Sequence, residues 1–326
     1  MITSARLFCG EIMANRSKAF FINGGAGRMI SSIPAFEKYL EESDDKDFII
    51  VCEGGTDVFK GHPSLDDRAY DIWHKGLFKD YLKNRDIVTT EPYRVWEYYN
   101  QQCSIAQAFD IEINGKGIRP LPKPTLKLSK DELLMGRQVV GEVKKKLNKE
   151  KIVVFQPFGR GIEYIDETLV DRTARSFELK DVKSVIKKLQ NNDYGVILMS
   201  EFKVDFSDAK LKDEVAMPEN MPPRVWAALI KFADHFLGCD SLGQHLAYCV
   251  EQKSTVVTGS TYPINVSYPD CEYFDILDMG EVSRIYSPIR ILPDERVDRQ
   301  NENIMAMTEE ITTLIVNHVL GKKDDS

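Results

Sequence analysis

The feature that most limits the fold of this chain is a repeated order of short apolar runs and stretches of helical spacing, with glycines between them. Residues 19–23 form an apolar run that ends in the glycine-rich turn 24–27, and apolar side chains then recur at helical spacing over residues 29–40. A second apolar run follows at residues 48–52. Strand, helix and strand in this order predict neighbouring parallel strands, and hence an α/β fold.

The same alternation restarts after a connector at residues 114–127, which is rich in glycine, proline and lysine. Ser129 with Glu132 three residues later predicts a capped helix over residues 130–148. Beyond it we expect strands at 152–155, 195–199, 234–238 and 254–258, and helices at 179–190, 223–232, 242–251 and 302–320. These strand and helix units predict a second Rossmann-like domain.

The region between the second strand and the connector is less regular. Residues 56–84 are rich in aromatic side chains and indicate loops and short helices over a sheet edge. We expect a strand at 86–90, a helix at 95–109 and a short strand at 110–113.

The length of 326 residues suits two domains with separate cores. The expected division is an N-terminal extension at 1–18, a first Rossmann-like domain at 19–125, a second at 126–300, and a C-terminal helix and polar tail at 301–326.

Composition narrows the classes of function. The net charge is −8, divided as +1 over residues 1–150 and −9 over residues 151–326, so bulk charge does not draw the molecule to phosphate backbones. Neither an apolar run of about 18 residues nor a signal-peptide core occurs, and we expect a cytoplasmic protein without a membrane-spanning segment. The six cysteines are scattered without a CxxC pair, which indicates reduced packing residues rather than disulfides or a metal site.

Ligands of open parallel sheets bind beyond the carboxyl ends of the strands, so the segments at those ends matter most. After the strand at 234–238, Asp240 or Ser241 can cap the next helix, and Gly243 lets a ligand approach closely. His245 lies near the helix start, where its ring can donate to a phosphate or sugar oxygen. The simpler alternative is a capping pair with a half-buried histidine.

Two further strand ends carry candidate ligand-binding residues. The turn after the strand at 254–258 offers hydroxyl and backbone donors to a phosphate or ribose, from Thr258, Gly259, Ser260 and Thr261. Small polar turns are common, so this signal alone is weak. After the strand at 152–155 come Gln156 and Arg160, followed by Arg172 and Arg175; such arginines can hold a diphosphate, although surface arginines are the default interpretation.

Taken together and in order, these segments resemble the ADP-heptose:lipopolysaccharide heptosyltransferases, a family of glycosyltransferases with the GT-B fold. Residues 240–247 are similar to the family's D-(S/T)-G-x-x-H-L-A motif, with Leu242 inserted, and residues 258–263 to its F-G-x-T-x-P turn. Residues 174–177 resemble its A-K-R-W segment, and residues 27–35 its N-terminal G-D-x-x-x-T-x-P-A.

The resemblance implies two Rossmann-like domains facing a cleft and an inverting, metal-independent sugar transfer from a nucleotide diphosphate sugar to an acceptor hydroxyl, with no further cofactor. It places Asp240 on hydroxyls of the donor sugar or ribose, and Ser241, Gly243 and His245 near the diphosphate. Arg175 would neutralise the leaving group, and residues 258–261 would line the nucleotide. Such donors suit the chemistry, because a departing diphosphate gains negative charge.

The first domain departs from the family pattern at one position. The family's catalytic aspartate follows the glycine of the first motif, and here Arg28 follows Gly27. Arginine cannot serve as a base at neutral pH. Either another carboxylate takes that role, with Glu53 and Asp57 as candidates, or catalysis is weak or lost. Gly25, Gly27 and Arg28 could instead contact an anionic acceptor or the diphosphate.

Several acceptors and two other functions stay open at this point. The acceptor could be a glycan, a small metabolite, a protein or a hydroxymethylated DNA base. A non-catalytic GT-B-like protein that binds a nucleotide sugar or glycan would explain Arg28. A nucleotide-sugar epimerase would need no acceptor. The sequence leaves the oligomeric state open.

Overall fold

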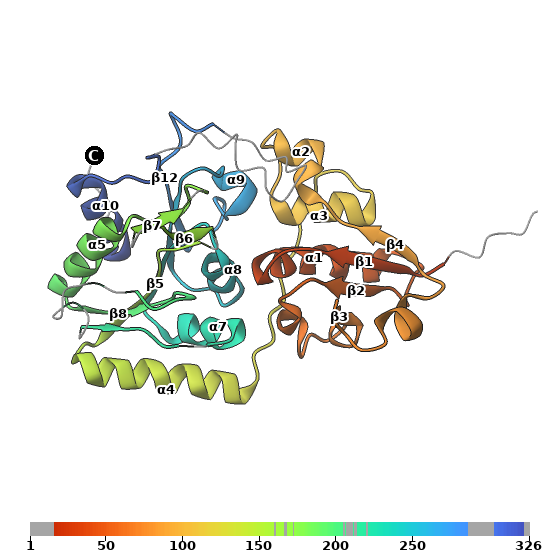
Figure 1. The fold of residues 1–326 in the computed structure, drawn as a ribbon, viewed down its shortest axis with the longest axis horizontal. Helices are drawn as coiled ribbons and strands as arrows, with labels where there is room; N and C mark the ends of the chain where they lie inside the picture. Colours follow the sequence, from red (N-terminus) through yellow and green to blue (C-terminus); the bar gives the residue numbers. More distant parts are fainter. Residues whose placement is uncertain are drawn as a thin grey trace, which may run out of the picture.

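The computed structural model describes residues 16–159, 161–165, 168–171, 173–204, 206, 211, 214–219, 221–285 and 303–322. Residues 1–15 of the expected N-terminal extension lie outside the described residues. Two α/β lobes are joined by an extended connector that runs from the first lobe down to α4 at the lower side of the second (Figure 1). Residues 16–114 form what we call the first lobe, and the described residues from 130 onward form the second lobe.

The first lobe is built on a four-stranded parallel sheet in the order β3-β2-β1-β4. Its strands are β1 (Lys18–Ile22), β2 (Ile49–Cys52), β3 (Ala69–Asp71) and β4 (Asp86–Thr89), and its longest helix is α1 (Ala26–Glu42). The short helical turns are η1 (Thr56–Phe59), η2 (Asp66–Arg68), η3 (Leu77–Leu82) and η4 (Pro92–Arg94). The ring of Phe20 on β1 packs against Phe36, Tyr39 and Phe48 at centroid distances of 5.1–6.0 Å, so α1 covers one face of this sheet with aromatic contacts.

The single helix expected at 95–109 is divided into two helices, and the strand expected at 110–113 is wrong because the second helix includes these residues. The structure has a short helix, α2 (Trp96–Tyr99), and then a separate helix, α3 (Ile105–Asn114). The side chains of Ser104 and Gln107 each accept a hydrogen bond from the other residue's backbone N–H, and this capping box starts a new helix at Ile105. Gly115, with φ of 64°, ends it.

The second lobe contains a six-stranded parallel sheet in the order β12-β11-β10-β5-β8-β9 and a separate β6-β7 hairpin. Its strands are β5 (Lys151–Gln156), β6 (Ile162–Ile165), β7 (Thr168–Asp171), β8 (Tyr194–Leu198), β9 (Val215–Ala216), β10 (His235–Cys239), β11 (Ser254–Thr258) and β12 (Phe274–Asp278). Its helices are α4 (Lys130–Leu147), α5 (Leu179–Asn191), α7 (Pro223–Phe232), α8 (Leu242–Cys249), α9 (Pro263–Val266) and α10 (Glu309–Val319). Strands β3, β9 and β12 and the hairpin were not predicted from the sequence, and α10 begins later than expected because Thr308 caps it.

Alternate side chains of β5 pack into two different cores. Ile152 and Val154 join a cluster with α7 and α8, whereas Val153 and Phe155 join a cluster with α5 and α10. The first of these clusters continues into the first lobe, where it contains Phe20. The two lobes therefore share buried apolar contacts.

Polar side chains of the second lobe also bond to the first. Buried Arg224 on α7 donates to the backbone oxygens of Asp57 and Lys60, at 3.3 and 2.8 Å, and pairs with Glu132 at 2.6 Å. Asn265 on α9 donates from Nδ2 to the backbone oxygens of Tyr98 and Cys103, at 2.9 and 2.8 Å. No helix among the described residues is both long and apolar enough to cross a bilayer.

Candidate functional site

Asp240 and Thr261 meet at the carboxyl ends of two adjacent strands. Asp240 follows β10 directly and is 4% exposed, and Thr261 lies in the turn after β11. The Asp240 carboxylate accepts hydrogen bonds from Thr261 Oγ1 at 2.9 Å and from Gln244 Nε2 at 2.7 Å. The structure therefore brings these two predicted residues together.

Arg175 reaches the same point from the loop that follows β7. Its Nη1 lies 3.5 Å from Asp240 Oδ2, and its Nε donates to Thr173 Oγ1 at 3.1 Å. The carboxylate of Asp171 shapes this loop, because it accepts from the backbone N–H groups of Thr173, Arg175 and Ser176 at 2.7, 3.2 and 2.8 Å. The side chain of Arg175 is thus held at the strand ends.

The electrostatics keep this cluster charged. Burial alone would lower the pKa of Arg175, but the carboxylates of Asp240 and Asp171 more than offset this and raise it. Burial would likewise raise the pKa of Asp171, and hydrogen bonds from Ser176 and Thr173 hold it below its usual value. The side chain of Arg175 is 23% exposed, so the cluster offers a fixed guanidinium that an anionic ligand can still reach.

The start of α8 is organised by Gln156 at the end of β5. Its Oε1 accepts from Gly243 N at 2.7 Å, and its Nε2 donates to Ser241 Oγ at 3.3 Å. A Cβ at Gly243 would lie 2.5 Å from that Oε1 and 2.6 Å from the ring of Phe236. Packing within the protein therefore requires this glycine, whereas from the sequence we expected it to allow the approach of a ligand.

His245 lies where the two lobes touch. Its Nδ1 is hydrogen-bonded to Tyr268 Oη at 2.7 Å, and a Cβ at Gly27 would lie only 3.1 Å from its Cδ2. Burial lowers the pKa of His245 to about 4, so the ring is neutral at pH 7. Tyr268 was not a candidate from the sequence, where no motif marked it.

Most donors of the turn after β11 bond to the protein itself. Thr258 Oγ1 donates to Asp278 at 3.3 Å, and Ser260 Oγ donates to the backbone oxygen of Thr173 at 2.5 Å. A Cβ at Gly259 would lie 2.6 Å from the backbone oxygen of Ala174. The turn is thereby fastened to the loop that carries Arg175, and its contact with a nucleotide stays a prediction.

In the first lobe, two predicted carboxylates lie after β2 and are exposed. Glu53 Oε2 accepts from the N–H of Gly24 at 2.7 Å, which places the carboxylate beside the end of β1. Asp57 lies in η1, and its backbone oxygen accepts from Arg224. Gly25 is the N-cap residue of α1 without a side chain that could cap the helix.

Arg28 is held by aromatic rings. Its guanidinium carbon lies 4.8 Å from the ring centroid of Tyr93 and 5.8 Å from that of Phe109. Among the described residues, no group accepts a hydrogen bond from its buried Nε and Nη2.

Glu112 on α3 is a further titratable group near Arg28. Burial raises its pKa to about 7, against a smaller lowering effect from Arg28. Glu112 was not a candidate from the sequence, because residues 110–113 were expected to form a strand. Arg160 and Arg172 lie outside the described residues. Among the residues that are described, no group of three or more His, Cys, Asp or Glu side chains is placed to hold a metal ion.

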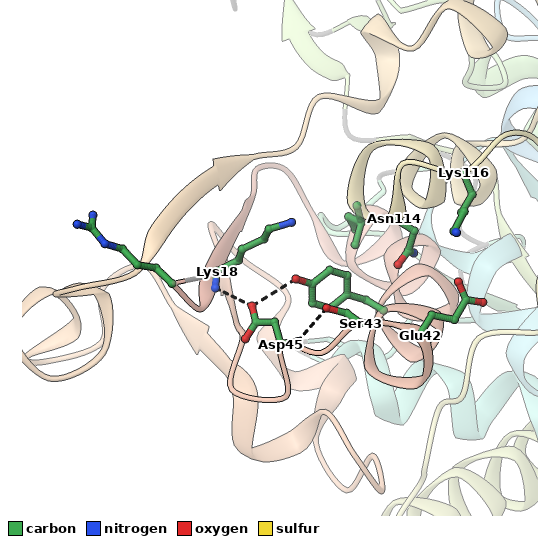
Figure 2. Close-up of a pocket in the computed structure, with 9 residues that line it drawn as sticks. Lys18, Glu42, Ser43, Asp45, Asn114 and Lys116 are labelled. Atoms are coloured by element: carbon green, nitrogen blue, oxygen red, sulfur yellow. Dashed lines mark hydrogen bonds between the residues drawn. The ribbon is translucent and has the colours of Figure 1, made fainter. Parts of the chain in front are cut away.

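Of two cavities that are lined by described residues, one lies away from the strand ends. The smaller, of about 300 Å³, is at the start of β1, where the backbone N–H of Lys18 and the hydroxyl of Tyr39 both donate to Asp45 (Figure 2). It lies at the opposite edge of the sheet from the ends where α/β proteins bind ligands. The larger lies between the lobes and is described below.

Comparison with known proteins gives matches among solved structures only. No family model and no curated protein matches the chain. A glycosyl transferase family 9 structure from Veillonella parvula is 8% identical, with a TM-score of 0.63 over 95% of this chain and 98% of that one. The E. coli ADP-heptose lps heptosyltransferase II is 10% identical, with a TM-score of 0.57 over 94% and 99%.

A third similar structure is the dodecameric iron-containing heptosyltransferase TibC, from enterotoxigenic E. coli, in complex with ADP-D-beta-D-heptose. It is 13% identical, with a TM-score of 0.58 over 94% of this chain and 77% of that one. At such identities the likeness establishes the fold. The chain has the GT-B fold of these glycosyltransferases, with a parallel sheet in each of its two lobes.

Proposed function

We propose that this protein is a glycosyltransferase, which moves a sugar from a nucleotide diphosphate sugar to an acceptor hydroxyl with inversion and without a metal. The observation that carries the proposal is the convergence of Arg175, Asp240 and Thr261 at the strand ends of the second lobe. The GT-B fold supports it, because the similar structures include heptosyltransferases and one of them holds ADP-D-beta-D-heptose.

In this proposal the second lobe binds the donor. Arg175 neutralises the diphosphate as it departs, and its effect grows as negative charge develops on the leaving oxygen. Asp240 accepts hydrogen bonds from hydroxyls of the ribose or the donor sugar, and Thr261 exchanges its present bond to Asp240 for one to the ligand. Ser241, His245 and the turn at 258–261 form the surrounding wall.

The first lobe supplies the acceptor side. A base takes the proton of the acceptor hydroxyl while that oxygen forms its bond to the anomeric carbon, and the bond from this carbon to the diphosphate breaks with its electron pair. We assign the base to Glu53, because its carboxylate is exposed and fixed beside Gly24 at the end of β1. Asp57 is the second candidate. Arg28 then binds an anionic group of the donor or the acceptor.

The test is a turnover assay that follows release of the nucleoside diphosphate from a panel of nucleotide diphosphate sugars. Loss of a general base lowers the rate by about 10²–10⁴-fold, and we expect Glu53→Gln to show a loss in that range. Asp57→Asn, a matched change after the same strand, should stay within about threefold of wild type if Glu53 is the base. Equal rates for wild type and both variants would contradict both assignments.

A non-catalytic function is favoured by one observation, the cationic Arg28 on the first turn of α1 next to Gly27. A binding protein of this kind would bind nucleoside diphosphates and release none from any donor. An epimerase would instead convert the donor to an epimer without an acceptor. Release of a nucleoside diphosphate distinguishes the transferase from both alternatives, and analysis of the recovered donor for an epimer distinguishes the epimerase from the binding protein.

A further inference from the structure

The larger cavity lies between the lobes and has a volume of about 710 Å³. Its walls come from α1, from the start of α3, from the connector at 118–124, from α8 and from the segment 264–273. We call it the connector cavity. Its volume lies within the range of small-molecule sites, and neither Arg175, Asp240 nor Thr261 lines it. It therefore lies beside the proposed donor site, with which it shares His245.

The walls of the connector cavity combine aromatic rings with uncharged polar groups. Tyr248, Tyr268 and Tyr273 form a row in which the rings of Tyr248 and Tyr268 stack at 3.7 Å. Asn265 and Ser267, which are 0% and 4% exposed, also line it. A sugar ring presents an apolar C–H face and a rim of hydroxyls, and such a wall offers a surface for each.

Two buried polar atoms in this wall have unmet hydrogen-bonding capacity. Among the described residues, neither Asn265 Oδ1 nor Ser267 Oγ has a hydrogen-bond partner. A buried polar atom without a partner is unfavourable, and the hydroxyl hydrogen of Ser267 can rotate about the Cβ–Oγ bond to suit a partner. Asn265 Nδ2 is occupied by the backbone oxygens of Tyr98 and Cys103, so its Oδ1 is free to accept.

The charges of the connector cavity select against anions. Lys123 is the only lysine or arginine among the described residues that line it, and its ammonium pairs with Glu251. Asp270 and Glu272 add further negative charge. A phosphate or a carboxylate would meet no unpaired cation here, so an uncharged ligand is favoured.

We propose that the connector cavity binds an uncharged saccharide unit of the acceptor, so that the portion of the acceptor inside the cavity is a neutral glycan. The identification of the bound saccharide as the acceptor rests on the proposed function. The position supports it, because His245 forms part of this wall through Tyr268 while its other edge touches Gly27 at the lobe contact. A saccharide in the cavity extends from there toward the strand ends that hold the donor.

The experiment measures binding of chitotriose, maltotriose and mannotriose to the full chain by calorimetry, with trigalacturonate as the anionic counterpart. Ala106→Trp fills the cavity from α3, and Leu134→Trp adds the same ring at a 65% exposed position outside it. We expect at least one neutral trisaccharide to bind, with an affinity at least about tenfold lower in Ala106→Trp and within about twofold of wild type in Leu134→Trp. Trigalacturonate should not bind.

The proposal is overturned if no neutral trisaccharide binds, if Ala106→Trp binds as tightly as wild type, or if trigalacturonate binds equally well. Nucleoside diphosphate binding, measured on the same variants, distinguishes this failure from failure of the proposed function. It should be unchanged in Ala106→Trp. If no variant and not even wild type bound a nucleoside diphosphate, the proposed donor site would be contradicted. The saccharide measurements would still test the connector cavity on their own.

Discussion

His245 is a residue whose charge depends on the contact between the lobes. Burial lowers its pKa to about 4, whereas a fully solvated histidine has a pKa of 6.5. The unfolded chain therefore takes up a proton as the pH falls below 6.5, while the folded protein does not. Stability from this group is fully present above pH 6.5 and is lost as the pH falls toward 4.

We therefore expect the free energy of unfolding to depend less on pH in His245→Gln than in wild type. The difference in slope between pH 6.5 and 4.5 should approach about 1.4 kcal/mol per pH unit. Urea unfolding at several pH values measures it. Comparison of the two proteins is needed because His235 contributes with the same sign and Glu112 with the opposite sign. Equal slopes would show that His245 is not buried.

Single residues also show what could be read from the sequence. Asp240 and Thr261 each follow a predicted strand, and this position predicted that they belong to one site, because adjacent parallel strands end at the same edge of a sheet. The contact of Gly243 with Gln156 and the aromatic support of Arg28 depend on partners about 65 to 87 residues away in sequence. No local pattern carries that information.

At the scale of elements, α4 and α7 approach closely at one glycine. A Cβ at Gly136 would lie 2.5 Å from that of Ala228 and 2.6 Å from the backbone carbon of the same residue. Gly136→Ala should therefore destabilise the protein by about 1–3 kcal/mol through overpacking. Gly141 on the same helix has no atom within 4 Å of such a Cβ.

Gly141→Ala is the matched control for this contact. Alanine is the better helix former, so this variant should be more stable than wild type by about 0.5–1 kcal/mol. Urea unfolding of both variants gives the comparison. A gain in stability in both would show that α4 and α7 do not pack closely.

Elements were predicted well where a local signal fixes both ends. Ser129 and Glu132 form the expected capping box, and α4 begins after it as predicted. The prediction for residues 95–113 was wrong because the second capping box, at Ser104 and Gln107, was not recognised as the start of a helix. Strands as short as β3 and β9 lie at sheet edges, and tertiary pairing rather than local pattern makes them strands.

At the scale of the whole molecule, Arg224 fixes the two lobes relative to each other. Its side chain is 5% exposed and bonds to Glu132 and to backbone oxygens of the first lobe. Hydrogen bonding to Arg224 helps to lower the pKa of Glu132 to about 2, so this carboxylate is ionised above that pH. Arg224→Ala should cost about 3–5 kcal/mol, because it leaves a partly buried charge and several oxygens without their donor.

The control for this prediction is Arg137→Ala on the exposed side of α4, which should stay within about 0.5 kcal/mol of wild type. Urea unfolding of both variants and of wild type measures the two changes in the free energy of unfolding. A loss below about 1 kcal/mol in Arg224→Ala would show that Arg224 does not hold the lobes together.

The most direct test of the account is calorimetric binding of ADP, UDP, GDP and dTDP to wild type, Arg175→Gln and Arg137→Gln. The account predicts that at least one nucleoside diphosphate binds wild type and Arg137→Gln alike, with an affinity at least about tenfold lower in Arg175→Gln. Binding that is equally tight in Arg175→Gln, or no binding of any of the four to wild type, would contradict it.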